Sequence, residues 1–251
     1  MSCKLVPCSD QSVVALLRRV ELGQVEISAP VEMATLIDAL TVDRRAIERV
    51  ARHAYRAPNH HFAEWTRRIW HHAMARATAM RLLAVRVPTR TLVDPMMAYS
   101  AGLLADVGAP YLLRWWAEGV FGSPTLEAAT VERISASVRL HHEAAGAALL
   151  TNWGFDPFTV HLARNHHVER PCYENPYWVL AVISEILART AAADPDLHHG
   201  TPLSAEVREA CCAAARVSPA ELRRLVTQVN VDFQSLRARM EDGVDDNTEL
   251  S

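Results

Sequence analysis

Six histidine and acidic side chains are spread along this chain at positions from which they could share a metal ion. They are His72, Asp106, His142, His166, His167 and Glu185. Imidazole nitrogens and carboxylate oxygens that reach one centre from several separate helices are the ligands that first-row divalent metals use in proteins. The residue types therefore predict a divalent metal site, provided that the elements carrying them converge.

Each of these residues also has a plainer interpretation. An aspartate at the end of a helix, such as Asp106, is usually a local hydrogen-bond acceptor. An inward histidine such as His72 is more often a satisfied core residue than a ligand, and a glutamate such as Glu185 usually faces solvent. Taken one at a time, the residues leave these alternatives open.

The elements that must position the first two residues are helices. Apolar residues recur at spacings of three and four over residues 62–85, which predicts a helix with His72 on its inward face. A run of small and apolar residues over 98–106 predicts a buried helix that ends at Asp106. Gly108 follows and can adopt the positive φ that closes a helix.

The downstream histidines belong to further predicted helices. A helix is predicted over residues 125–141, and His142 either opens a new segment or continues this helix. Gly146 would let a neighbouring helix approach closely. Asp156 is predicted to cap a helix that starts at Pro157 and ends in the His166–His167 pair. His161 lies five residues before His166 and is off that face, so it is left out of the site.

The remaining periodicity is helical as well, and the predicted fold class is all-α. Helices are predicted at 177–191, 204–216 and 219–240, the last with a break near Asn230, and three short ones before residue 57. No strand-like alternation, glycine-rich phosphate loop or cysteine zinc pattern occurs. The adjacent Trp115 and Trp116 are not expected to face the same core. One of them is predicted to cover a groove or an interface, or alternatively to be partly buried against the following loop.

Composition narrows the classes of protein further. The 251 residues are 50% hydrophobic, with a net charge of −3 and a pI of about 6.5, so no basic field favours nucleic acid. No apolar run reaches 18 residues and no signal-peptide core is present, which predicts a cytoplasmic protein without membrane spans. Five cysteines without ligand spacing suit a reducing compartment.

In their order these motifs resemble the HD superfamily of metal-dependent phosphohydrolases, and specifically its regulatory branch, the HDOD domain. This chain contains five motifs of that family in the same order. They are a histidine after a tryptophan (His72), an acid after a Leu-Leu helix (Asp106), a histidine four residues before a glycine (His142), a His-His pair (His166 and His167) and a late acid (Glu185). The resemblance implies an N-terminal helical part at 1–57, an HD-like helical core at 58–193 and C-terminal helices at 194–240. Residues 241–251 are acidic and predicted to be disordered.

Two departures from the HD pattern bear on activity. Ala105 stands where the superfamily has the histidine of its His-Asp doublet, and Ala109 stands where many active members have a lysine. The resemblance implies one ion held by His72, the doublet histidine, Asp106 and Glu185, and that set has lost a ligand. The set implied for a second ion, Asp106 with His142, His166 and His167, is complete.

Three functions are consistent with this pattern. The favoured one is a non-enzymatic bacterial regulatory module that contacts a protein partner or a small signalling molecule. The alternative is a metal-dependent phosphohydrolase of nucleotides or cyclic dinucleotides, and the third is a protein that holds one ion for stability alone. The resemblance implies that no cofactor is required and that one divalent ion could bind, with iron, manganese, nickel and zinc as candidates. The sequence leaves the oligomeric state open.

Overall fold

The computed structural model describes residues 51–52, 54–86, 94–119, 128–167, 176–192 and 204–242. Within these ranges the chain is helical and has no β-strand, which confirms the predicted all-α fold. The helices predicted before residue 51, and the disorder predicted for 243–251, lie outside the described residues. The chain divides into two compact units, Met1–Trp70 with Leu103–Val168 and His71–Gly102 with Glu169–Ser251.

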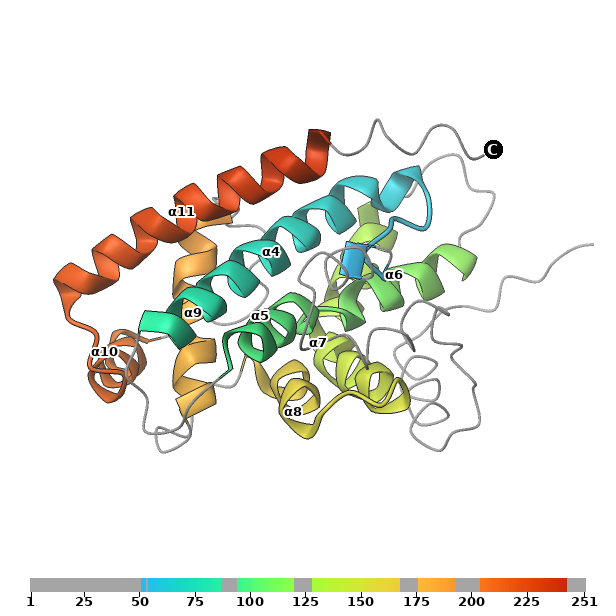
Figure 1. Ribbon diagram of the computed structural model, residues 1–251. Coiled ribbons are helices and arrows are strands. Elements are labelled where there is room, and N and C mark those ends of the chain that lie inside the picture. The colour runs from blue at the N-terminus through green and yellow to red at the C-terminus, as the bar shows by residue number, and fades with distance from the viewer. Residues whose placement is uncertain are drawn as a thin grey trace, which may run out of the picture. The chain divides into compact units, whose positions relative to one another are not determined.

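The first unit is built around one long helix. Its described elements are the 3-10 helix η1 (His60–Phe62), the start of α4 (Ala63–Arg86), α6 (Gly108–Gly119), α7 (Ala128–Asn152) and α8 (Pro157–Asn165) (Figure 1). Helix α7 packs against both α6 and α8. It runs unbroken through His142, because no proline lies between residues 128 and 152 and the single Gly146 does not stop a helix of this length.

Apolar side chains from η1, α6 and α7 form the core of this unit. Leu112, Leu113 and Ile134 are fully buried in it, and each such side chain contributes about 1.5–3 kcal/mol through burial. Trp116 is buried, while Trp115 is half-buried and meets the Trp116 ring edge-on at 5.4 Å. Trp115 also packs against this core, so the prediction that the two adjacent tryptophans cannot share one core is wrong. The partial burial of Trp115 agrees with the alternative that was left open.

Two glycines let α6 and α7 approach closely. A Cβ atom on Gly108 would lie 2.0 Å from the carbonyl oxygen of His142 and 2.4 Å from the nitrogen of Gly146. The predicted positive φ of Gly108 is wrong, since Gly108 begins α6 and, among the described glycines, only Gly154 has a positive φ, of 76°. Gly108 is needed for the close approach, and the predicted role of Gly146 is confirmed.

The second unit contains the rest of α4, most of α5 (Pro95–Leu104), α9 (Pro176–Ala192), α10 (Ala205–Ala214) and α11 (Pro219–Asp242). Helix α9 packs against α10 and α11, and a Cβ atom on Gly102 would lie 2.9 Å from the Cα of Ala77. The predicted break near Asn230 is wrong, because α11 continues through it, and this helix extends two residues into the predicted tail.

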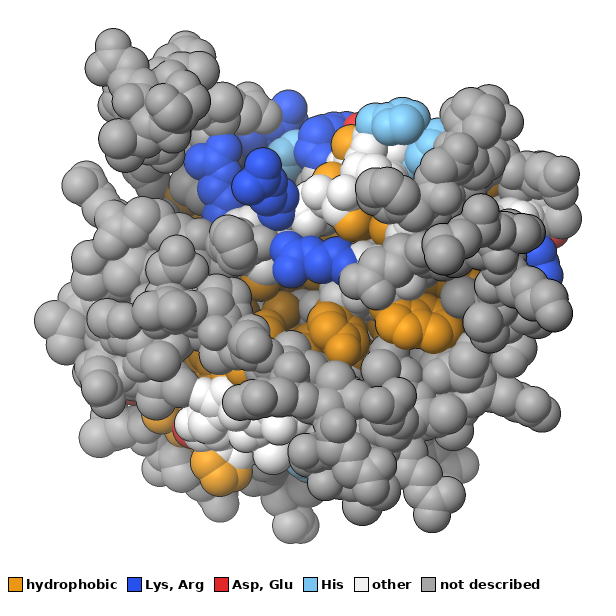
Figure 2. Space-filling view, turned by 90° about the vertical axis from the view of Figure 1, so that its right-hand side faces the viewer, with side chains coloured by type: hydrophobic (Ala, Val, Ile, Leu, Met, Phe, Trp, Pro, Cys, Tyr) orange, Lys and Arg blue, Asp and Glu red, His pale blue; other side chains and the backbone are white. Residues whose placement is uncertain are grey.

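Side chains of several chemical types lie on the surface of the described residues. Figure 2 shows apolar, arginine and histidine side chains of the described residues on one face. None of the helices in the described ranges is both long and apolar enough to span a bilayer.

Candidate metal centre

One aspartate and three histidines of the first unit bring their ligand atoms together. Asp106, His142, His166 and His167 each offer one nitrogen or oxygen, and these four atoms all lie within 4.8 Å of one another. The first three residues are buried and His167 is partly exposed. They are the four residues that the sequence analysis assigned to the complete ligand set.

Asp106 is held in the tight turn that joins α5 to α6. The Val107 N–H donates to the Leu104 carbonyl at 3.1 Å, and the Ala109 N–H donates to the Asp106 carbonyl at 2.9 Å. These bonds fix the backbone on both sides of the residue. The carboxylate is therefore presented from a rigid, buried position, with the residue only 7% exposed.

His142 and His166 both direct one ring nitrogen at their own helix. His142 Nδ1 lies 2.9 Å from the Val138 carbonyl on α7, and His166 Nδ1, at the C-terminal cap of α8, lies 3.0 Å from the Ala163 carbonyl. A carbonyl oxygen only accepts hydrogen bonds, so each Nδ1 carries the hydrogen. This leaves the Nε2 atom of each ring to face the centre of the group.

The atoms that face this centre are all electron-rich. His142 Nε2 lies 3.3 Å from His166 Nε2 and 3.9 Å from Asp106 Oδ1, and His166 Nε2 lies 2.9 Å from the same oxygen. Two lone pairs and a carboxylate oxygen at these distances repel one another, and a metal ion placed between them would relieve this repulsion. Nitrogen ligands arranged tetrahedrally around zinc lie about 3.3–3.4 Å apart, which matches the histidine pair.

Burial holds His142 in the neutral form that a metal requires. Burial, as the largest cause, and the nearby charge of His166 together lower the pKa of His142 from 6.5 to about 4, while Asp106 opposes the shift. A neutral imidazole with its hydrogen on Nδ1 is a ready ligand through Nε2.

Glu143 supports the group from α7 and was missed in the sequence. Its Oε1 accepts a hydrogen bond from the His167 N–H at 3.0 Å and lies 3.8 Å from His166 Nδ1. It thereby ties the end of α8 to α7, next to two of the candidate ligands. Its position gave no signal, because consecutive residues of a helix point about 100° apart and Glu143 directly follows His142.

One protein family matches part of the chain. The family model of the HDOD domain matches residues 46–169. The chain contains an HDOD domain. No curated protein and no solved structure matches the chain. The four residues of the Asp106 group and His72 lie within the HDOD domain, whereas Glu185 lies after its end.

The other two predicted ligands form a separate group in the second unit. His72 on α4 is 6% exposed and Glu185 on α9 is 3% exposed, and His72 Nε2 lies 3.1 Å from Glu185 Oε2. Neither residue belongs to the four-atom set around Asp106. The predicted inward orientation of His72 is confirmed by its burial, and Glu185, for which a solvent-facing orientation was left open, is buried as well.

Arg76 joins His72 and Glu185 and was also missed in the sequence. Its Nε donates to Glu185 Oε2 at 3.0 Å, and its Nη2 lies 3.1 Å from His72 Nε2. The signal was present, because Arg76 follows His72 by four residues and so continues the inward stripe of α4. A charged residue on an otherwise apolar stripe indicates a buried partner.

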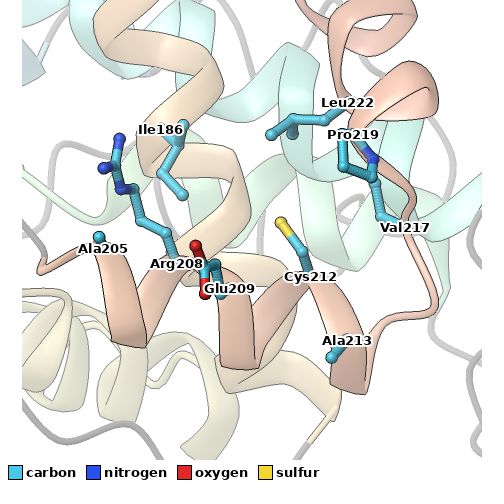
Figure 3. Close-up of a pocket in the computed structure, with 9 residues that line it drawn as sticks. All are labelled: Ile186, Ala205, Arg208, Glu209, Cys212, Ala213, Val217, Pro219 and Leu222. Atoms are coloured by element: carbon cyan, nitrogen blue, oxygen red, sulfur yellow. The ribbon is translucent and has the colours of Figure 1, made fainter.

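A pocket of about 390 Å³ in the second unit lies apart in the sequence from all of these residues (Figure 3). It is lined mainly by α10 and the start of α11, with Ile186 from α9, and its walls are mostly apolar. The Cys212 sulfur points into it. The pocket contains none of the candidate metal ligands and lies outside the HDOD domain.

Proposed function

We propose that this chain is a non-enzymatic regulatory module that acts in bacterial signal transduction in the cytoplasm. Its HDOD domain would contact a protein partner or a small signalling molecule. The observation that carries the proposal is Ala105, which is fully buried directly before Asp106 and holds a methyl group where the superfamily pattern has a histidine. A methyl group can neither bind a metal ion nor transfer a proton.

The remaining ligands suffice for one ion. Asp106, His142, His166 and His167 would hold it, and when bound it would supply Lewis acidity to an oxygen-bearing ligand. Two-ion phosphoester hydrolysis also needs a second ion to stabilise the attacking and leaving oxygens. The buried methyl of Ala109, at the start of α6, supplies no positive charge for a phosphate either.

The alternative function is metal-dependent hydrolysis of nucleotides or cyclic dinucleotides. The convergence of three histidines and one aspartate on a buried centre favours it over a purely structural domain. In this case His142 and His166 would orient the ligand through Nε2, and Asp106 would hold a proton or share the ion. A site that only stabilises the fold would use the same four residues without any substrate.

Turnover assays test the proposal. The full chain is assayed with a generic phosphodiester, nucleotides and cyclic dinucleotides in the presence of manganese, magnesium, iron or nickel. We expect no hydrolysis above the background of an Asp106→Ala variant. Hydrolysis by the wild type that Asp106→Ala abolishes would overturn the proposal in favour of the phosphohydrolase.

A further inference from the structure

A fully buried arginine contacts both candidate ligands of the second unit. Arg76 has no exposed surface, and His72 and Glu185, which flank its guanidinium group, are 6% and 3% exposed. Its Nη2 donates to Glu185 Oε2 and lies 3.1 Å from His72 Nε2. Its Nε donates to the same carboxylate oxygen at 3.0 Å.

The atoms that Arg76 contacts are the ones that would bind a metal ion. His72 Nε2 and Glu185 Oε2 lie 3.1 Å apart, a separation that two ligands of one divalent ion can have. A guanidinium nitrogen already lies within hydrogen-bond distance of both. Because a guanidinium group stays protonated in proteins, this positive charge does not leave to make room for an ion.

The second oxygen of Glu185 is also engaged by a guanidinium group. Arg189 Nε donates to Glu185 Oε1 at 2.7 Å, one turn further along α9. The two arginines differ in burial, since the Arg189 side chain is 20% exposed whereas the Arg76 side chain is fully buried. The buried carboxylate is therefore fully neutralised by residues of the chain itself.

We propose that Arg76 is a built-in cation that replaces a metal ion between His72 and Glu185 and closes this pair to divalent metals. Of the residues that the structure describes, only the Asp106 group then remains as a candidate site for an ion. The inference rests on contacts within the second unit and is independent of the proposed regulatory role, because a one-ion protein can be either a regulator or an enzyme.

The metal content of the full chain and of its variants tests whether Arg76 closes the His72–Glu185 pair to metal. Each protein is stripped with a chelator, reloaded with zinc and freed of excess metal, and its zinc is measured by elemental analysis. We expect at most one zinc per chain in the wild type, with the same value for Glu185→Gln. Arg76→Met should hold one zinc more than the wild type, and Arg76→Met combined with Glu185→Gln should lose that additional ion.

Arg189→Met is the matched control, because it removes the other guanidinium from the same carboxylate and leaves Arg76 in place. It should keep the wild-type zinc content. Arg76→His is the second variant for the case in which Arg76→Met does not fold, since a histidine one turn from His72 adds a nitrogen ligand. Arg76→His should also bind one zinc more than the wild type, and its melting temperature should rise when zinc is added.

Two results would overturn the proposal. One is a wild-type zinc ion that Glu185→Gln removes, which would mean that the pair binds metal in spite of Arg76. The other is a zinc content no higher than that of the wild type in both Arg76→Met and Arg76→His. Phosphoester turnover is measured separately, so neither result bears on the proposed regulatory role.

Discussion

His142 and His166 face each other through their Nε2 atoms, which lie 3.3 Å apart. Both rings direct Nδ1 at a backbone carbonyl of their own helix, so in their neutral forms both Nε2 atoms carry lone pairs. Asp106 adds a carboxylate oxygen 2.9 Å from one of them. This arrangement is unfavourable without a cation, and that requirement makes the Asp106 group a candidate binding centre.

The first prediction concerns metal removal. If a divalent ion binds at the Asp106 group, it stabilises the folded state by mass action, by about 3 kcal/mol at a free concentration 100 times Kd. We expect chelation to lower the melting temperature of the wild type and to leave that of His142→Ala unchanged. Differential scanning calorimetry with and without chelator measures this.

His161→Ala is the control for metal removal. His161 is exposed on α8, five residues from His166, and lies outside the four-ligand group. This variant should respond to the chelator as the wild type does. An equal response in His142→Ala would show that the stabilising ion binds elsewhere.

The second prediction concerns the close approach of α6 and α7. Gly108→Ala would place a Cβ atom 2.0 Å from the carbonyl oxygen of His142, and this backbone atom cannot move without shifting α7. We expect a loss of about 3 kcal/mol or more in the free energy of unfolding, at the upper end of overpacking effects. Denaturant unfolding measures it.

Gly146→Ala is the matched comparison for this crossing. Its added Cβ would meet the Gly108 nitrogen at 3.3 Å and no described atom at a shorter distance, so a small backbone shift relieves it. We expect a change of about 1 kcal/mol or less, since alanine also favours the helix. A loss in Gly108→Ala as small as that in Gly146→Ala would show that the two helices lie further apart than the structure has them.

Much of this arrangement could be predicted from the sequence. Helical periodicity predicted α4 and α9, and the caps at Asp156 and Pro157 predicted the start of α8; the Asp156 side chain does accept from the Thr159 N–H. The close approach at Gly146 was predicted as well. These features depend on local spacing, which the sequence contains directly.

The features that were missed depend on distant parts of the chain. The place of Arg76 on the apolar stripe of α4 indicated a buried partner, but not which one, because Glu185 lies 109 residues away. Gly108 was predicted to be needed for a positive φ, whereas the structure needs a glycine there because α7 approaches so closely. A glycine needed for contact and one needed for conformation look alike in a single sequence.

The third prediction concerns the acid stability of the metal-free protein. Burial lowers the pKa of His142 to about 4 in the folded state, against about 6.5 when unfolded. Because the pKa is lower in the folded state, the unfolded state binds the proton first as the pH falls. The contribution of His142 to the free energy of unfolding is therefore fully present above pH 6.5 and decreases as the pH falls toward 4. The full difference corresponds to about 3 kcal/mol.

Unfolding of the wild type and of His142→Gln in chelator, between pH 7 and pH 4, measures this effect. The difference in free energy of unfolding between the two proteins should shrink as the pH falls through this window. His161→Gln, which alters an exposed histidine of the same unit, should keep the wild-type dependence. A difference between wild type and His142→Gln that stays constant with pH would contradict the assigned cause.

The fourth prediction concerns the adjacent thiols of α10. Burial raises the pKa of the Cys211 thiol to about 12, so almost no thiolate is present at pH 8. Cys212 is partly exposed, and its sulfur points into the pocket of the second unit (Figure 3). Burial raises its pKa too, but the neighbouring Arg208 charge opposes the shift.

Because the thiolate is the reactive form, Cys212 should react with iodoacetamide at pH 8 at least about ten times faster than Cys211. Trypsin cleaves after Arg208 and Arg216, so both thiols fall in one peptide and fragment ions tell them apart. Cys212→Ala should remove the rapid labelling of this peptide, and Cys211→Ala should keep it. Equal labelling of the two thiols in the wild type would mean that α10 opens on the timescale of the reaction, and that Cys211 is not held in a closed core.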